Sequence, residues 1–415
     1  MSAEIWRPFT QMQGFKERGR VVEARGAWLS FEGGHRAVDG ISSWWVNTHG
    51  HAHPKIAEAI AAQARRFDQV ILADFSHGPV AELTQTLGDI LPGDDRRIFY
   101  SDNGSTAVEV ALKMALQAKK HLGEPERRGF VSFSGAYHGD TLGAMSVGAR
   151  GIFNEPMWDL LFDCTELPYG DIEALRQYLQ SDGQSVAAVI MEPLVQGAAG
   201  LVFSSPEYLR ACSELCQEFG CFLILDEVMT GWGRTGTMFA CEQAGVVPDL
   251  LAASKGVTGG TLPLGVTACS PQIYEAFLGD SPQRAFLHGH SYTGNPIACA
   301  AANAAMALYA QEGTLQRVAA MEYQYKAVGP LFEGLDGVEN IRQIGGIFAF
   351  DLRSDVGGYL DPIGRRVCDR TFELGLYTRP LGNTCYLMPP FCIGEAELET
   401  CLDQLFESVR AELSA

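Results

Sequence analysis

Acidic residues follow two apolar segments of the chain at the points where those segments end. The run VAAVIM is followed by Glu192, and the run CFLIL is followed by Asp226 and Glu227. In an open parallel sheet, ligands bind beyond the carboxyl ends of the strands, so these acids are expected at the ligand-binding edge. A buried carboxylate is costly unless a positive group compensates it, which indicates an electropositive partner. An extended chain would turn Glu227 away from Asp226, so we expect Glu227 to be structural.

Two positively charged side chains are candidate partners for these acids. Lys255 is the only lysine between Lys120 and Lys326, and it follows a short apolar run among small neighbours. A lysine amine with an ordinary pKa of about 10.4 is protonated, and it becomes useful once it condenses with a carbonyl group. The alternative is an ion pair between one of the acids and Arg234 in the segment GWGRTG.

Two further loops follow expected strands and give weaker signals. After RRIFY, Gly104 and Ser105 begin a helix whose free backbone N–H groups favour a phosphate, although such residues also occur in ordinary turns and N-caps. After GFVSF, Tyr137 and His138 lie on a glycine-flanked loop. The tyrosine can cover the face of a flat ring, and alternatively both residues satisfy local hydrogen bonds.

One ligand accounts for these residues together, namely pyridoxal 5'-phosphate (PLP). Its phosphate suits the helix N-terminus at Gly104 and Ser105, and its aldehyde suits the amine of Lys255. Its ring suits an aromatic cover by Tyr137, and its pyridine nitrogen suits Asp226, which keeps that nitrogen protonated as an electron sink. The pyridinium would then be the counter-charge that makes a buried Asp226 tolerable.

The elements that must position these residues alternate between short strands and helices. Strands are expected at RRIFY, GFVSF, VAAVIM, CFLIL and residues 250–253, and helices at STAVEVALKMALQAKKH and SPEYLRACSELCQEFG. This alternation is typical of βαβ units and of a mainly parallel sheet covered on both faces. The expected fold is therefore α/β, with a large domain built around that sheet.

A second, smaller domain is expected from the two ends of the chain. Asn295 is a suitable N-cap for the helix PIACAAANAAMALYAQEG, with Pro296 at its first position and Gly313 as its stop. Beyond it, the pattern mixes an amphipathic helix with strand-like runs. We expect a large PLP-binding domain at 46–311 and a small α+β domain built from 1–45 and 312–415.

Composition excludes several other classes of protein. The 415 residues are 47% hydrophobic with a net charge of -19, which disfavours nucleic acid and anionic membranes as partners. No apolar run is long enough to span a bilayer, and the start MSAEIWRPFTQMQ has no apolar signal region, so a cytoplasmic location is expected. The eleven cysteines are scattered without paired CxxC spacing, which indicates core thiols and no metal site.

The chain resembles the class III, PLP-dependent aminotransferases of fold type I over nearly its full length. The resemblance rests on LILDEV, GRTG, ASKGVTGG and HGHSYTGNP. It implies catalytic roles for Lys255, Asp226 and Tyr137. It also implies a homodimer with shared sites, in which Ser291, at a position where threonine is usual, binds the phosphate of the neighbouring subunit. The residues that it implies for cofactor binding are Gly104, Ser105, Tyr137, His138, Glu192, Asp226, Val228, Lys255 and Ser291.

Further segments resemble one branch of this family, including WRPFTQM, DGISSWWVNTHGHAHP, AYHGDTLGAMSVG and TRPLGNTCYLMPP. That branch converts 8-amino-7-oxononanoate to 7,8-diaminononanoate in biotin biosynthesis, with S-adenosylmethionine or lysine as amino donor. Trp44 and Tyr137 suit the methylene chain of the keto acid, and Arg379 suits its carboxylate. The residues expected to bind substrate are Phe9, Trp44, Tyr137, Lys255, Gly289 and Arg379.

Several alternatives stay open at this point. Trp45 is expected to be a core tryptophan, and Arg379 is equally compatible with a surface position beside Pro380. Phe9 stands where tyrosine is usual, which leaves the choice between the two amino donors open. The competing activities are a broad ω-amine or ω-amino acid:pyruvate transaminase and, in another reaction class, a decarboxylase or aminomutase on the same scaffold.

Overall fold

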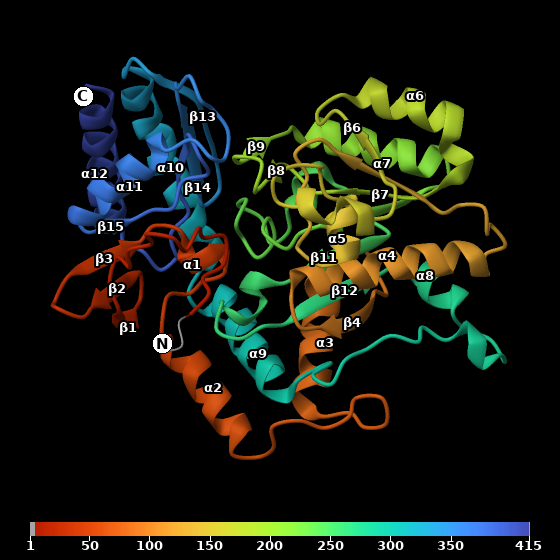
Figure 1. Ribbon diagram of the computed structural model, residues 1–415. Helices are drawn as coiled ribbons and strands as arrows, with labels where there is room; N and C mark the ends of the chain where they lie inside the picture. Colours follow the sequence, from red (N-terminus) through yellow and green to blue (C-terminus); the bar gives the residue numbers. More distant parts are fainter. Residues whose placement is uncertain (1–4, 415) are drawn as a thin grey trace.

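A computed structural model describes residues 5–414 and is built around one seven-stranded sheet (Figure 1). Only β12 runs antiparallel to its neighbours, and the other paired strands are parallel, so the expected mainly parallel sheet is confirmed. β6 and β12 are not among the strands that the sequence pattern predicts. In spatial order the strands are β4 (Arg97–Ser101), β12 (Gly265–Cys269), β11 (Leu250–Ala253), β10 (Phe222–Asp226), β7 (Val186–Met191), β5 (Gly129–Phe133) and β6 (Thr165–Leu167).

Both faces of the sheet are buried, which explains why its strands read as unbroken apolar runs. In β10, Phe222 and Ile224 pack into one hydrophobic cluster, whereas Leu223 and Leu225 pack into another. This alternation places the two clusters on opposite faces. The helices of this part are α2 (Pro54–Ala64), α3 (Gly78–Ile90), α4 (Gly104–His121), α5 (Leu142–Val147), α6 (Ile172–Asp182), α7 (Pro206–Glu218), α8 (Pro271–Ala276) and α9 (Pro296–Gln311).

Short elements complete this part of the chain. They are the pair β8 (Val195–Gln196) and β9 (Val202–Phe203), and the 3-10 turns η1 (Glu155–Leu160), η2 (Gly183–Ser185), η3 (Ala240–Ala244), η4 (Lys255–Thr258) and η5 (Pro282–Arg284). Helix α9 begins as predicted, because the Asn295 side chain accepts hydrogen bonds from the N–H groups of Ile297 and Ala298.

The two ends of the chain lie together on one side of the molecule, where Figure 1 shows red beside blue. Strand β3 pairs in parallel with β15, which joins the N-terminal meander to the C-terminal segment. The sheets here are β1 (Val21–Arg25), β2 (Trp28–Phe31), β3 (Arg36–Asp39) and β15 (Leu376–Tyr377), and β13 (Val338–Ile344), β14 (Ile347–Leu352) and β16 (Thr384–Leu387). The helices are α1 (Ser42–Trp45), α10 (Thr314–Glu333), α11 (Ile363–Glu373) and α12 (Glu395–Leu413).

We propose the domain division at 46–311 against 1–45 with 312–415, of which residues 1–4 and 415 lie outside the described range. The N- and C-terminal segments share a hydrophobic cluster that includes Val38, Phe348 and Leu405. Across residues 5–414, no helix is both long and apolar enough to cross a membrane. The same residues contain no group of three or more histidine, cysteine and acidic side chains that could hold a metal ion.

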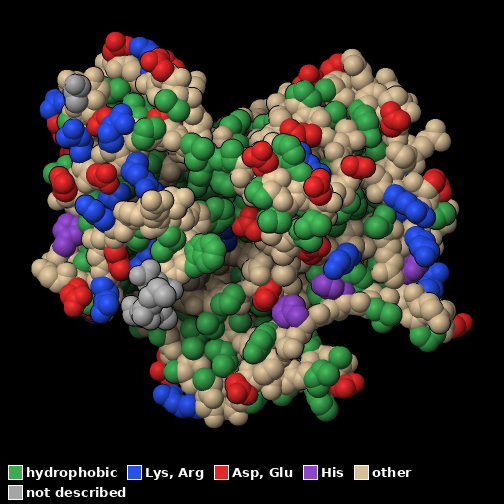
Figure 2. Space-filling model, viewed as in Figure 1, with side chains coloured by type: hydrophobic (Ala, Val, Ile, Leu, Met, Phe, Trp, Pro, Cys, Tyr) green, Lys and Arg blue, Asp and Glu red, His purple; other side chains and the backbone are tan. Residues whose placement is uncertain are grey.

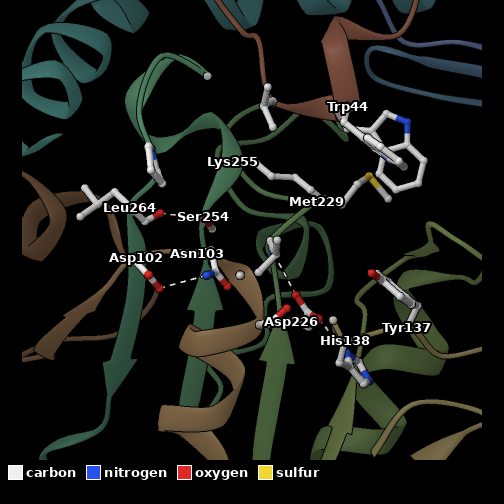
Figure 3. A pocket seen from close by; sticks show the side chains of 18 of the residues that line it. Trp44, Asp102, Asn103, Tyr137, His138, Asp226, Met229, Ser254, Lys255 and Leu264 are labelled. Carbon is white, nitrogen blue, oxygen red and sulfur yellow. Dashed lines mark hydrogen bonds and ion pairs between the residues drawn. The ribbon is translucent and has the colours of Figure 1, made fainter. Parts of the chain in front are cut away.

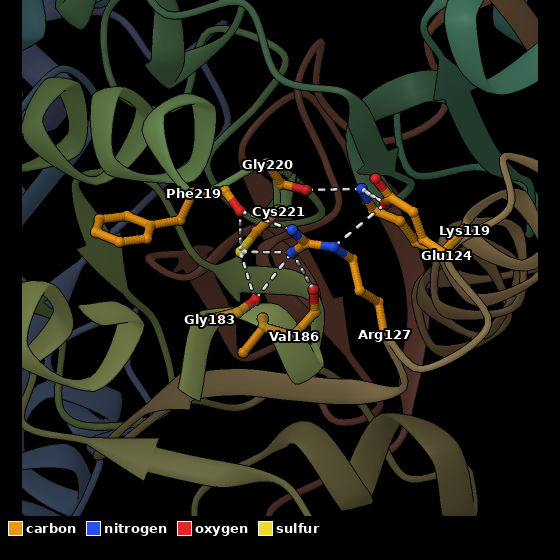
Figure 4. A network of polar contacts seen from close by, with 8 residues as sticks. All are labelled: Lys119, Glu124, Arg127, Gly183, Val186, Phe219, Gly220 and Cys221. Carbon is orange, nitrogen blue, oxygen red and sulfur yellow. Dashed lines mark hydrogen bonds and ion pairs between the residues drawn. The ribbon is translucent and has the colours of Figure 1, made fainter. Parts of the chain in front are cut away.

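A polar network closes the amino-terminal edge of the central sheet, opposite the edge where ligands are expected (Figure 4). The Arg127 guanidinium donates to the carbonyls of Gly183 at 2.9 Å, Val186 at 3.2 Å and Phe219 at 3.1 Å. Its Nε lies 3.2 Å from a Glu124 carboxylate oxygen. One arginine therefore ties the loop before β5 to the segments that precede β7 and β10.

Replacing Arg127 by alanine should destabilise the protein by about 2–3 kcal/mol, because buried carbonyls lose a charged donor. Thermal unfolding of the holoprotein, followed by circular dichroism, measures this loss. Arg128→Ala is the matched control, since Arg128 is exposed and its Nε donates to the Pro125 carbonyl. Equal shifts in the two variants would contradict the structural role given to Arg127.

Candidate active site

A cavity of about 520 Å³ opens beyond the carboxyl ends of β4, β5, β7, β10 and β11 (Figure 3). Figure 2 shows the molecule hollowed between the terminal part and the central part, with hydrophobic side chains on the walls of the hollow. The cavity brings together ten of the thirteen residues proposed from the sequence. They are Phe9, Trp44, Gly104, Ser105, Tyr137, His138, Glu192, Asp226, Val228 and Lys255.

Asp226 is the last residue of β10 and is held by two hydrogen bonds. Its Oδ2 accepts from His138 Nδ1 at 2.7 Å, and its Oδ1 accepts from the backbone N–H of Val228 at 3.0 Å. Burial tends to lower the pKa of His138, but the hydrogen bond and the charge of Asp226 outweigh it and raise the pKa. His138 therefore orients the Asp226 carboxylate, and the apolar strand behind it fixes its position.

Lys255 begins η4 directly after β11 and projects into the same cavity (Figure 3). Its Nζ lies 5.0 Å from the centre of the Trp45 ring. Burial lowers the pKa of Lys255 to about 8, although the charges of Asp226 and Glu192 oppose this effect. A substantial fraction of the amine is therefore neutral near physiological pH, which makes Lys255 a nucleophile before any cofactor binds.

Glu192 follows β7 and connects two loops of the site. Its Oε1 accepts from the Tyr137 N–H at 3.2 Å, and its Oε2 accepts from the Gly197 N–H at 2.8 Å. Burial raises the pKa of Glu192 to about 7, against the opposing charge of His138. The Tyr137 hydroxyl donates to Asp140 Oδ2 at 2.9 Å. Glu192 thus positions the backbone that carries Tyr137.

The N-terminus of α4 has the features of a phosphate site. Asn103 caps the helix by accepting from the Thr106 N–H at 3.1 Å. Within the described residues, the N–H groups of Gly104 and Ser105 have no hydrogen-bond acceptor, so they remain available to an anion. A Cβ added at Gly104 would lie 2.6 Å from a Val228 methyl group, so only glycine fits this close approach.

These features fit PLP. The cavity offers a free amine at Lys255, a buried carboxylate at Asp226, an aromatic side chain at Tyr137, and a helix N-terminus at Gly104 and Ser105. They are the groups that the aldehyde, the pyridine nitrogen, the ring face and the phosphate of this cofactor require.

Three residues proposed from the sequence do not line the cavity. Gly289 and Ser291 lie in an exposed segment between η5 and α9. The guanidinium of Arg379 lies 4.8 Å from the ring centre of Trp44, so Arg379 reaches the cavity mouth indirectly. Arg379 is partly buried, so its substrate-binding role stays a prediction.

The alternative ion pair of Arg234 is wrong. Within residues 5–414 its guanidinium forms no ion pair with an acid, and it donates to the carbonyls of Pro389 at 3.2 Å and Asn47 at 3.3 Å. It also stacks over the Phe391 ring at 4.4 Å. The segment GWGRTG gives no indication of these partners, because they come from both ends of the chain.

Sequence reasoning missed the apolar part of the cavity. Met229 and the loop from Gly260 to Leu264 line it, and this loop leads into the unpredicted strand β12. The stretch GGTLPLG, which begins four residues after Lys255, was the available signal. Trp45 is buried, as expected of a core tryptophan, but it also lines the cavity.

The fold and the cavity together define a PLP-dependent transaminase, and comparisons with known proteins support this class. The family described as aminotransferase class-III matches residues 15–409. The adenosylmethionine-8-amino-7-oxononanoate aminotransferase of Synechococcus elongatus is 48% identical over 95% of this chain and 96% of its own length. The enzyme of the same name from Geobacter sulfurreducens is 38% identical over 98% of this chain and 95% of its own length.

Solved structures agree with these sequence matches. The crystal structure of adenosylmethionine-8-amino-7-oxononanoate aminotransferase from Methanocaldococcus jannaschii superposes with a TM-score of 0.94 at 33% identity, covering 98% of this chain and 97% of that one. A PLP-bound amine transaminase from an uncultivated Pseudomonas species gives a TM-score of 0.91 at 30% identity, covering 99% of both chains. The chain belongs to the class III aminotransferase family.

The lowered pKa of Lys255 predicts how its reactivity depends on pH. In the cofactor-free protein, acylation of Lys255 by a small neutral reagent should increase with pH and reach half of its maximum near pH 8, because the neutral amine is the nucleophile. Peptide mass spectrometry measures the extent of acylation at each pH. Acylation of the exposed Lys120, measured in the same samples, controls for changes in the reactivity of the reagent with pH. The Lys255→Ala variant should lack the acylated peptide, which checks that this peptide is assigned correctly. A midpoint near the ordinary value of 10.5 would contradict the buried amine.

Proposed function

We propose that this enzyme transfers an amino group to 8-amino-7-oxononanoate and forms 7,8-diaminononanoate in biotin biosynthesis. The observation that carries the proposal is the placement of Arg379 over Trp44, 4.8 Å from its ring centre, at the mouth of the cavity. A long aliphatic keto acid needs apolar walls for its methylene chain and a cation for its distant carboxylate. Trp44 and Arg379 supply both, and Lys255 lines the same cavity as Trp44. The names of the relatives from Synechococcus and Geobacter are consistent with this substrate.

The residues of this chain have distinct roles in the proposed reaction. PLP, when bound, supplies an aldehyde that accepts amines and a ring that stabilises negative charge at the reacting carbon. Lys255 would hold the cofactor and, once displaced by the donor amine, move a proton at the donor carbon. Asp226, oriented by His138, would keep the ring nitrogen protonated. Tyr137 would cover the ring, and Glu192 would hold the Tyr137 loop in place.

The amino donor is S-adenosylmethionine or lysine. The rings of Phe9 and Trp44 are 5.4 Å apart, and the Phe153 ring lies 6.0 Å from that of Phe9. This aromatic surface suits the cationic group that both donors carry. The phenylalanine at position 9 has no hydroxyl to contribute, so donor recognition there would rest on ring faces.

The proposal includes a cytoplasmic homodimer. The segment that carries Gly289 and Ser291 is exposed in the single chain and does not reach its own cavity. Ser291 would bind the cofactor phosphate of the neighbouring subunit, and Gly289 would allow close approach to the substrate there. Leu287 and Tyr292 flank these residues and are 85% and 65% exposed, which is consistent with an interface.

Steady-state turnover tests the proposed substrate against its main competitor. The holoenzyme, supplied in turn with S-adenosylmethionine and lysine, should convert 8-amino-7-oxononanoate with a kcat/KM at least about tenfold above that for pyruvate with simple ω-amines. The reason is that only the long keto acid has both a methylene chain to pack against Trp44 and a distant carboxylate for Arg379. The product is quantified by mass spectrometry. A preference for pyruvate with either donor would favour a broad ω-amine transaminase instead.

Arg379→Ala should raise the KM for the keto acid by about 10- to 100-fold, because a charge-assisted bidentate contact is lost. The donor half-reaction, measured separately under single-turnover conditions, should change much less. Arg379→Lys is the matched control and should recover part of the loss, since it keeps the charge without the planar fork. Equal damage to both half-reactions would contradict the assignment of Arg379 to the carboxylate.

A further inference from the structure

Two adjacent tryptophans line the same cavity, which regular secondary structure does not allow. Neighbouring side chains point to opposite faces of a strand and to well-separated directions around a helix. Trp44 is 38% exposed at the mouth, whereas Trp45 is 6% exposed and donates from Nε1 to the Tyr386 hydroxyl at 3.0 Å. Lys255 Nζ lies over the Trp45 ring. The backbone between the two tryptophans must therefore be irregular.

The backbone of this turn is strained. Ser42, Ser43 and Trp45 have φ angles of 52°, 62° and 64°, in the left-handed region that favours glycine. Ser43 combines its positive φ with a ψ of -87°, a combination that residues with a Cβ rarely adopt. None of these residues is glycine, so the surrounding structure must hold the turn in this conformation.

A buried carboxylate provides the restraint. Asp39 is 0% exposed and lies at the end of β3. Its Oδ2 accepts from the Ser43 N–H at 2.6 Å, and its Oδ1 accepts from the Ile41 N–H at 3.3 Å. His51 Nε2 donates to Oδ2 at 2.9 Å, and the His51 backbone exchanges two hydrogen bonds with Gly26. The carboxylate is thus fixed by His51 and bonded directly to the most strained residue.

The opposite side of the turn is held by the C-terminal segment. Ser42 Oγ donates to the Met388 carbonyl at 2.7 Å, and the Tyr386 hydroxyl accepts a hydrogen bond from Trp45 Nε1. These contacts fix Trp45, but neither one bonds to the Ser43 backbone. Backbone hydrogen bonds also span the turn, from Trp45 N–H to the Ile41 carbonyl and from Val46 N–H to the Ser42 carbonyl, each at 3.0 Å. The bond from Ser43 N–H to Asp39 is the side-chain restraint on the residue that precedes Trp44.

We propose that Asp39 and His51 are positioning residues for substrate binding. They hold the strained turn so that Trp44 and Trp45 both face the cavity, and they act through these tryptophans without touching the substrate. Without the carboxylate, the turn relaxes, Trp44 leaves the position where Arg379 stacks on it, and the wall for the methylene chain is lost. This inference rests on the proposed function, since it assigns the tryptophan wall to the long keto acid.

The test measures KM and kcat for 8-amino-7-oxononanoate in Asp39→Asn holoenzyme. The asparagine has nearly the same shape but offers one neutral acceptor, so KM should rise about tenfold while kcat changes less than about threefold. PLP content, measured by absorbance after release in alkali, should stay at the wild-type value. Asp249→Asn is the matched control, because Asp249 accepts from the Leu223 N–H at 2.8 Å at the other end of β10. It should leave KM unchanged.

A glycine at position 43 distinguishes the proposed role of Asp39 from a general loss of structure in the Asp39→Asn variant. Glycine adopts the Ser43 conformation without strain, so Asp39→Asn combined with Ser43→Gly should restore KM to within about threefold of wild type. Ser43→Gly alone should keep the wild-type KM. An unchanged KM in Asp39→Asn, or no rescue in the double variant, would overturn the proposal.

A second pair of variants keeps the proposal testable if Asp39→Asn does not fold. His51→Gln retains a donor that can reach Asp39 and should keep KM close to wild type, whereas His51→Ala should raise KM severalfold with PLP content unchanged. Equal KM values in the two would overturn the role of His51. Absence of activity in the wild-type enzyme toward this keto acid would instead contradict the proposed function, so the two failures are distinguishable.

Discussion

The structure depends on one buried carboxylate at the end of the strand β10. Asp226 stands behind four apolar residues in the middle of the central sheet, where an unpaired charge would be strongly destabilising. His138 compensates it through a hydrogen bond of 2.7 Å, and the carboxylate still faces the cavity that Lys255 enters. A cofactor with a cationic ring nitrogen would complete this arrangement. The fold therefore presents a preorganised charge and needs no rearrangement to use it.

The two edges of the central sheet serve different purposes. At the amino ends of the strands, Arg127 ties the loops together by donating to backbone carbonyls. At the carboxyl ends, Asp226 is the last residue of β10, and Glu192 and Lys255 follow β7 and β11. Among the described residues, neither carboxylate forms an ion pair with an arginine. The other edge carries acids and an amine whose burial is unfavourable without a compensating partner.

The sequence predicted the part of the site that follows local rules. Strands ending in acids, a solitary lysine and a capped helix after a strand identified Glu192, Asp226, Lys255 and Gly104, because each depends only on its own segment. The features that the sequence could not predict depend on contacts between segments that lie far apart in the chain. Strand β12 runs antiparallel to its two neighbours and so lies outside the alternation of parallel strands and helices that the pattern predicts. Arg234 bonds to carbonyls contributed by both ends of the chain. The strained turn at Ser43 is also invisible in the sequence, since serine gives no indication of a positive φ.

The most direct test of this account is the absorbance spectrum of the purified holoenzyme before and after addition of 7,8-diaminononanoate. This compound should donate its amino group in the reverse direction, with Trp44 and Arg379 in their proposed role of holding its chain and Lys255 and Asp226 in theirs at the cofactor. The account predicts that the absorbance of the aldehyde form of the cofactor is replaced by that of its amine form. An unchanged spectrum with the diamine, together with loss of the aldehyde absorbance on addition of simple ω-amines, would contradict the proposed substrate.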